Sequence, residues 1–320
     1  MRHLSISLVA AVFVCAAGAQ ASAKSLATGI ELLPGRFVAG EQPDGNTLVF
    51  DGAGGLVVFD TGRHAAHTQA IIDYAHARDL PIVAIVNSHW HLDHVGGNAM
   101  LRKAFPAVRI HASDAIEDAM HGFLAKYRAQ IEGILARPDG DATQNAAMRD
   151  ELALIDAGPA LYPDERIMKG SMQSIAGRRV RIGFEARAVT AGDVWLFDPA
   201  MRVLAAGDLV TLPVPLFDTA CPPRWKAALA HLDKVDFATL APGHGAPMTR
   251  ATFATYRKAF DNLLACADGK SPKDICIDGW MRDGKLLIPE GDEKLARGLL
   301  GYYLDGILRD ASKTKSLCGA

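Results

Sequence analysis

Three histidines and an aspartate lie within residues 89–94, directly after a run of apolar, β-prone residues. The run covers residues 81–86, and the cluster consists of His89, His91, Asp93 and His94. A strand that ends in such a cluster places several imidazoles and a carboxylate at one edge of a sheet, and this set of ligands suits zinc. The alternative is a solvated turn, but surface turns are rich in Gly, Asn, Asp, Ser and Pro, not in closely spaced histidines. The block therefore predicts a metal site.

Two later segments offer further ligands at the ends of predicted strands. Asp208 follows an apolar run at 202–206, and His244 lies between two glycines after the run at 237–240. The ends of strands at one edge of an α/β sheet are where ligand sites form. His89 and His91 are two residues apart, so their side chains point the same way if the backbone is extended. We therefore expect one or two zinc ions at this edge.

Short β-prone runs and helical patterns alternate along the chain, which indicates an α/β protein. We expect strands near 37–39, 46–50, 55–60, 81–86, 108–111, 179–182, 193–197, 202–206 and 237–240, and helices near 65–79, 224–234, 249–266 and 293–310. Residues 113–170 are helical and charged and predict an insertion or lid. The domain organisation expected is a main domain at 24–262 that contains this insertion, followed by a helical extension at 263–320.

The first 23 residues are typical of an export signal. A short basic start precedes the apolar run Leu4–Ala17, and the small residues Ala21–Ala23 suit cleavage. The run is too short to cross a bilayer as a helix. An uncleaved membrane anchor is the alternative, against which the small residues argue. We expect an exported protein, periplasmic or secreted, with no stable membrane insertion after cleavage.

Four cysteines remain after the signal, and an even number in an exported protein suggests disulfides. Cys266 and Cys276 lie ten residues apart around a turn-like segment and form the favoured pair. Cys221 with Cys318 then follows by elimination. The alternative is that Cys221 ligates zinc, but no other ligand lies near it in the sequence.

The composition narrows the partners that this chain can have. The formal net charge of −2 over 320 residues gives no reason to expect nucleic acid as a partner. A chain of this length can form one large domain with a substantial core. We therefore expect no nucleic acid partner, while the oligomeric state stays open.

Five motifs occur in a defined order across residues 30–250. They are Asp60-Thr61-Gly62, the His89–His94 block, Gly192-Asp193, Gly207-Asp208 and Pro242-Gly243-His244-Gly245. With these motifs the chain resembles the metallo-β-lactamase-fold hydrolase superfamily. The resemblance implies an α/β fold, a four-layer αβ/βα sandwich with metal at the open edge where its two sheets meet.

The resemblance also implies a role for each ligand. His89 and His91 would serve a first metal, Asp208 would bridge, and a second metal would be served by Asp93, His94 and His244. It further implies a zinc-dependent hydrolase, in which a metal-bound hydroxide cleaves an ester, lactone, thioester or amide-like bond of a small-molecule substrate. Asp93 would be the catalytic residue, orienting the nucleophile and carrying a proton towards the leaving group.

The chain departs from the family pattern at one position. A third histidine of the first site usually stands four residues before the aspartate of Gly192-Asp193, and here that position is Val189. Three explanations are open: water completes a weakly held first metal, the enzyme uses the second site alone, or Glu185 substitutes. Glu185 shares strand parity with residue 189 if the segment is extended.

Two other functions compete with the general hydrolase. An exported β-lactamase that hydrolyses β-lactam antibiotics fits the family, although Asp208 and the missing histidine argue against it. A non-catalytic metal-binding or redox-relay protein of the cell envelope fits an incomplete first site. Zinc-dependent turnover that is lost on His91→Ala would distinguish an enzyme from a binding protein.

Overall fold

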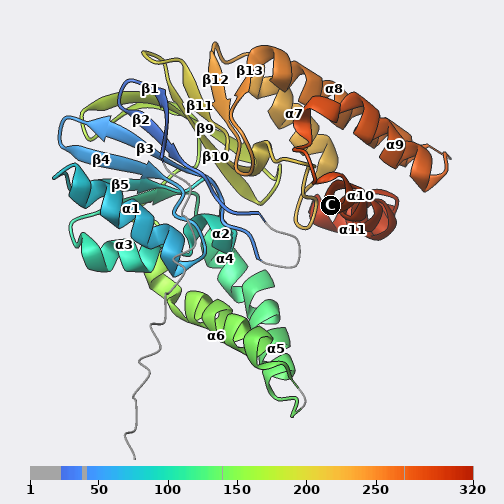
Figure 1. Ribbon diagram of the computed structural model, residues 1–320, viewed down its shortest axis with the longest axis horizontal. Coiled ribbons are helices and arrows are strands. Elements are labelled where there is room, and N and C mark those ends of the chain that lie inside the picture. Colours follow the sequence, from blue (N-terminus) through green and yellow to red (C-terminus); the bar gives the residue numbers. More distant parts are fainter. Residues whose placement is uncertain (1–22, 38–41, 139, 270, 320) are drawn as a thin grey trace, which may run out of the picture.

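The computed structural model describes residues 23–37, 42–138, 140–269 and 271–319. Two β-sheets pack face to face, and helices cover the outer face of each sheet (Figure 1). The predicted export signal, apart from its last residue, lies outside the described residues, as does most of the strand expected at 37–39. The four-layer αβ/βα sandwich that the sequence predicted is confirmed.

The first sheet contains seven strands that follow one another in sequence order. They are β1 (Lys24–Ala27), β2 (Ile30–Leu33), β3 (Thr47–Gly52), β4 (Gly55–Phe59), β5 (Ile82–Val86), β6 (Arg109–Ala112) and β7 (Glu165–Arg166). On β4, Leu56 and Val58 pack under the helices α1 (Ala65–Ala77) and α3 (Asn98–Ala104). The alternate residues Val57 and Phe59 face the second sheet, as the two-residue period of a strand requires.

The second sheet contains six strands in the order β13-β12-β11-β10-β9-β8. They are β8 (Ser171–Ile175), β9 (Arg178–Ala186), β10 (Gly192–Asp198), β11 (Val203–Ala205), β12 (Thr239–Ala241) and β13 (Met248–Thr249). On β10, Val194 and Leu196 face the first sheet, whereas Trp195 and Phe197 pack against α7 (Pro222–Leu232) and α8 (Arg250–Asp268). β10 is therefore buried on both faces.

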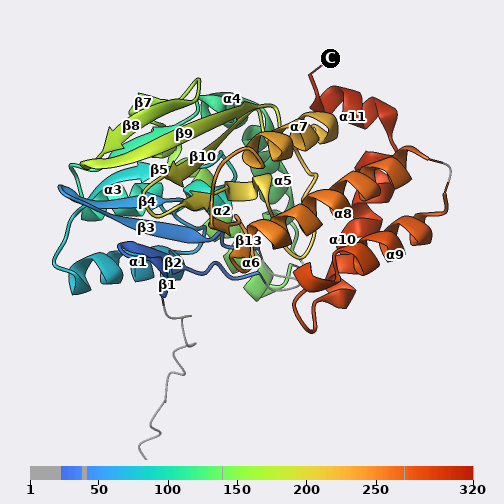
Figure 2. The ribbon, with the colours of Figure 1, turned by 90° about the horizontal axis from the view of Figure 1, so that it is seen from above.

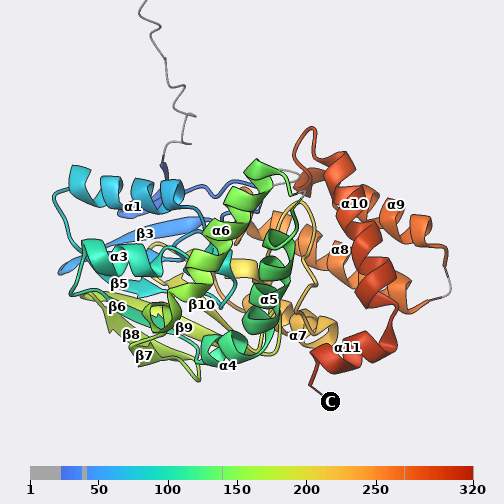
Figure 3. The ribbon, with the colours of Figure 1, turned by 90° about the horizontal axis from the view of Figure 1, so that it is seen from below.

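The predicted insertion at 113–170 contains α4 (Ala115–His121), α5 (Phe123–Leu135) and α6 (Ala142–Asp156), and near its end the chain returns to the first sheet as β7. Figure 3 shows α5 and α6 side by side at the edge of the sandwich. Their apolar side chains Leu124, Ile131 and Ile155 form one buried cluster with Trp90 and Leu92 of the histidine block. The insertion is thus packed directly onto the segment that carries the predicted ligands.

The C-terminal extension adds α9 (Lys273–Asp283), α10 (Glu293–Tyr303) and α11 (Ala311–Leu317), which gather with α8 at one end of the molecule (Figure 2). These helices share a hydrophobic core with the second sheet, since Trp280 and Leu300 belong to the same buried cluster as Trp195. Across the described residues, no helix has the length and apolar character needed to cross a membrane.

Both predicted disulfides are present, Cys221–Cys318 and Cys266–Cys276. The first ties α11 to the start of α7, and the second ties α8 to α9. Paired cysteines are consistent with an exported protein, because disulfides persist in oxidising compartments.

The two disulfides close loops of very different length, so their removal should have unequal effects. Their cysteines are 97 and 10 residues apart, and loop entropy predicts losses of about 4–5 and about 2–3 kcal/mol in the free energy of unfolding. The two double variants, C221S/C318S and C266S/C276S, are well matched, because each pair has one buried and one half-buried cysteine. Urea denaturation measures both. A larger loss for C266S/C276S would contradict the expectation.

Candidate metal centre

The predicted ligands come from the segments that follow three strands and that meet at one edge of the sandwich. The histidine block follows β5 and runs into the short helix α2 (Leu92–Val95). Asp208 lies in the 3-10 turn η2 (Gly207–Leu209) after β11, and His244 follows β12. The structure brings together all six ligands named from the sequence, and all but the half-buried His91 are buried.

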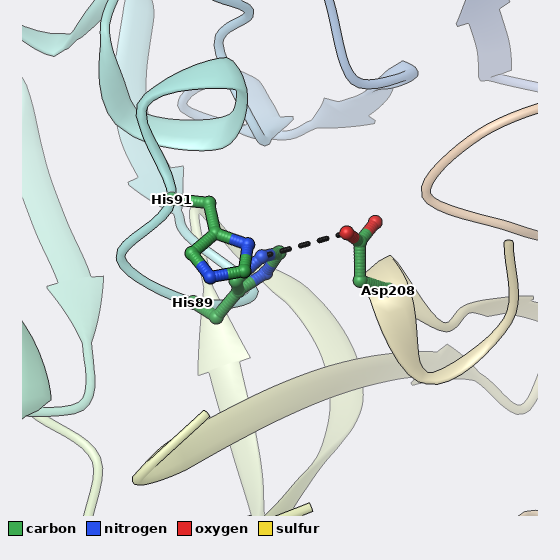
Figure 4. A group of neighbouring side chains, drawn as sticks. All are labelled: His89, His91 and Asp208. Atoms are coloured by element: carbon green, nitrogen blue, oxygen red, sulfur yellow. Dashed lines mark ion pairs between the residues drawn. The ribbon is translucent and has the colours of Figure 1, made fainter. Parts of the chain in front are cut away.

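These residues form two groups of three, and in each group the ligand atoms lie within 4.8 Å of one another. The first group contains His89, His91 and Asp208 (Figure 4). The second group contains Asp93, His94 and His244. Each group offers the three protein ligands that catalytic zinc sites use.

Asp208 faces both groups with different oxygens. Its Oδ2 lies 3.7 Å from His89 Nε2 (Figure 4), and its Oδ1 lies 3.1 Å from His94 Nε2 and 3.5 Å from His244 Nε2. Ligand atoms about 2.0–2.1 Å from one tetrahedral zinc are about 3.3 Å apart, so these separations suit ions held on either side of the carboxylate. Asp208 also takes the third place in the first group, where Val189 offers no ligand.

Several of these buried atoms have no hydrogen-bond partner among the residues that the structure describes. They are His89 Nε2, His94 Nε2, His244 Nε2 and Asp208 Oδ1. Unpaired polar atoms in a protein interior are costly, and all four point into the two groups. The donor set therefore fits divalent metal ions.

Two glycines allow Asp208 to approach the histidines. Gly207 has a φ of +53°, and a Cβ there would lie 2.4 Å from Ser88 Cβ. A Cβ on Gly243 would lie 2.0 Å from Asp208 Oδ1. A side chain at position 207 would collide with Ser88, and one at position 243 would displace the Asp208 carboxylate, which explains why glycines precede Asp208 and His244.

Asp60 orients the histidine block from behind. Its carboxylate accepts hydrogen bonds from Ser88 N at 2.7 Å, Ser88 Oγ at 2.7 Å and His94 Nδ1 at 2.8 Å. Because Nδ1 of His94 donates, its Nε2 is the nitrogen available to a metal. Asp60 itself has a φ of 61°, a conformation that aspartate tolerates better than most residues.

Thr219 orients His91 in a comparable way. Its Oγ1 donates to the carbonyl oxygen of Val189 at 2.9 Å and lies 2.8 Å from His91 Nε2. Since its single proton is used by Val189, the hydroxyl accepts from His91 Nε2–H, which leaves Nδ1 of His91 for a metal. Val189 therefore contributes through its backbone, while its side chain is buried in the core beneath α7.

The proposal that Glu185 replaces the missing histidine is wrong. Its carboxylate accepts from Trp195 Nε1 at 3.2 Å and lies 2.9 Å from His231 Nδ1, so it belongs to neither ligand group. The parity argument fails because Arg187 has a φ of 59°, which interrupts the extended backbone between residues 185 and 189.

The protonation states suit metal binding. Burial lowers the pKa of His89 well below its ordinary value and also lowers that of His91, so both imidazoles are neutral. Burial opposes charge on His94 too, but the carboxylates of Asp208, Asp93 and Asp60 outweigh it and raise its pKa well above the ordinary value. These carboxylates favour a positive charge beside His94, which a metal cation would supply.

A cavity of about 440 Å³ opens beside the ligands, within the usual range for small-molecule sites. His91, Asp93 and Asp208 line its floor, and the insertion and the C-terminal extension both reach its walls. Its other described lining residues are Phe37, Gln42, Pro43, Arg63, Trp90, Leu92, Phe123, Leu124, Tyr127, Leu216, Asp218, Thr219, Leu299, Tyr302 and Tyr303. Leu216 and Asp218 show that the loop at 213–218 forms part of the wall.

Arg63 is a residue of the site that the sequence did not reveal. Its Nη1 lies 2.6 Å from both carboxylate oxygens of Glu151 on α6, and its Nη2 lies 3.5 Å from Asp93 Oδ1. It thereby connects the insertion to a predicted ligand. No local pattern marks it, because its partners are distant in the sequence.

The profile of the metallo-beta-lactamase superfamily matches residues 41–244. The chain therefore belongs to the metallo-β-lactamase superfamily. Among solved structures, the metallo-beta-lactamase from Pontibacter korlensis has a TM-score of 0.54 at 17% identity, over 75% of this chain and 99% of that one. DIM-1 metallo-beta-lactamase has a TM-score of 0.54 at 14% identity, over 75% and 96%. At such identities the likeness shows the fold alone.

Curated relatives share shorter parts of the sequence. A hydroxyacylglutathione hydrolase from Gloeobacter violaceus is 43% identical over 65 residues, which are 18% of this chain and 26% of that protein. A linear primary-alkylsulfatase from a Pseudomonas strain is 25% identical over 217 residues, which are 61% of this chain and 40% of that protein. The matches thus span less than half of either relative.

Thr219 should govern metal affinity at the first group. T219V removes the acceptor for His91 Nε2–H and frees the ring to rotate or change tautomer, so we expect about 10- to 100-fold weaker binding of one zinc ion. T219S keeps the hydroxyl and is the matched control. Competition with a chromophoric chelator measures both. Undiminished zinc binding by T219V would contradict the role assigned to this hydroxyl.

Proposed function

We propose that this protein is a zinc-dependent hydrolase that cleaves an ester, lactone, thioester or amide-like bond. The observation that carries the proposal is the pair of neighbouring ligand groups, both faced by Asp208, at the floor of a cavity of about 440 Å³. His89, His91 and Asp208 would hold one ion, and Asp93, His94 and His244 would hold the other together with Asp208. Zinc bound there would lower the pKa of water to about 7 and polarise a scissile carbonyl.

Residues around the cavity would transfer a proton, orient the reacting groups and exclude water. Asp93 lines the cavity, and its Oδ2 lies 3.0 Å from His244 Nε2. We assign to this carboxylate the transfer of a proton towards the leaving group. Arg63, 3.5 Å from Asp93 Oδ1 and anchored on Glu151, would hold the carboxylate in orientation. Trp90 and Leu216 would keep bulk water from the reacting bond.

The substrate site draws on the whole predicted domain organisation. We propose that the domain at 24–262, its insertion at 113–170 and the extension at 263–320 all shape the cavity, because Leu124 and Tyr303 line it alongside the ligands. We also propose that the protein acts outside the cytoplasm. The two disulfides support this location.

The cavity favours an enzyme over the two alternatives. A protein that only stores or relays metal has no use for an apolar cavity that ends on the ligands, so a binding role is less favoured. β-Lactam hydrolysis is also less favoured, because those antibiotics carry a carboxylate for which the described walls offer no unpaired cation.

Zinc removal and a ligand substitution test the proposal. We expect the purified protein to hydrolyse at least one p-nitrophenyl ester, lactone or thioester, to lose this activity in chelator and to regain it with zinc. H94A should lose at least about 100-fold in kcat/KM, because it removes a ligand of the second group. The exposed His121, outside both groups, gives the control variant H121A. Turnover that survives both chelation and H94A would overturn the proposal.

A further inference from the structure

The walls of the cavity are apolar and carry little positive charge. Aromatic and aliphatic side chains dominate them, and Arg63 is the only lysine or arginine among the described lining residues. The reacting bond of a substrate would lie against the metal ligands, so the rest of the molecule would contact these walls.

Arg63 is not free to bind an anion. Its guanidinium is engaged by Glu151 at 2.6 Å, by Asp93 at 3.5 Å and by the carbonyl oxygen of Pro43, to which Nε donates at 3.1 Å. Only 9% of its side chain is exposed. Two carboxylates balance its single charge, so a negatively charged substrate would have to displace a buried partner.

Asp218 adds a negative charge to the wall. Its side chain is exposed, and its Oδ2 accepts a hydrogen bond of 2.6 Å from the hydroxyl of Tyr303 on α10. Tyr303 is buried and neutral, so it fixes the carboxylate without neutralising it. Beside it the exposed Tyr302 also lines the cavity and offers an aromatic face to a cation.

We propose that this site selects substrates that are uncharged or positively charged outside the scissile bond and that carry a largely apolar group, with Asp218 as the residue that determines this charge preference. The inference rests on the proposed hydrolase function. Trp90, Leu124 and Leu216 supply the apolar contact. Asp218 repels an anionic substituent and attracts a cationic one, while the engaged Arg63 offers an anion nothing in return.

Three matched aryl esters test the proposal. They share one scaffold and carry a carboxylate, a methyl ester or a trimethylammonium group at the same ring position. On the zinc-loaded wild type we expect kcat/KM to be lowest for the anionic ester. D218N should reduce the ratio of cationic to anionic kcat/KM about 3- to 10-fold, the effect of one partly screened charge several ångströms away.

The control variant removes an aspartate charge at a position outside the cavity. Asp236 is 82% exposed and does not line the cavity, so D236N should leave the ratio unchanged. A wild-type preference for the anionic ester, or an equal ratio in D218N and D236N, would overturn the charge preference.

A binding experiment distinguishes failure of the charge preference from failure of the proposed hydrolase function. Ketone analogues of the three esters, in which CH2 replaces the ester oxygen, cannot be hydrolysed and are titrated into the zinc-loaded protein by calorimetry. If no ester, lactone or thioester is turned over but the anionic ketone binds most weakly and D218N removes the difference, the hydrolase proposal fails and the charge preference stands. If esters are turned over and the ketones bind irrespective of charge, the charge preference fails alone.

Discussion

The candidate site depends on one packing constraint, the face-to-face contact of the two sheets. His89 and His94 follow a strand of the first sheet, whereas Asp208 and His244 follow strands of the second. Apolar residues between the sheets, among them Phe59 and Leu196, hold these strand ends at a common edge. Because burial of apolar surface is the largest favourable term in folding, the energy of the core is also what assembles the ligands.

Much of this arrangement could be predicted from local sequence. A histidine block after an apolar strand, and an aspartate and a histidine beside glycines after two later strands, share the property of standing at strand ends. The fold brings such ends together, so proximity follows from the architecture. The two disulfides were predictable for a related reason, since an even number of cysteines leaves few pairings.

Asp60 stood in a motif of the sequence, but the other residues that orient the site were not predictable. Thr219 is 128 residues from His91 in the sequence, and Glu151 is 88 residues from Arg63. Their contacts depend on how a loop and an insertion pack, which no periodic pattern encodes. β1, β2 and β8 were missed as well, because β1 and β2 are only four residues long and β8 directly follows the segment predicted as a helical insertion.

Val189 stands where the family pattern has a histidine, yet three potential metal ligands still gather in the first group. Its side chain joins the apolar core, its carbonyl holds Thr219, and Asp208 lies third in the group with His89 and His91. The orientation of His91 then rests on a hydroxyl and a backbone carbonyl. The sequence motifs therefore suggest an incomplete first site, whereas the structure forms two groups of three residues.

Anomalous diffraction at the zinc edge, on crystals of the zinc-loaded protein, would locate the ions that the two groups are proposed to hold. We expect two peaks, one beside His89 and His91 and one beside His94 and His244, with a carboxylate oxygen of Asp208 coordinating each. A single peak at the second group, or two peaks with Asp208 turned away from both, would contradict this expectation.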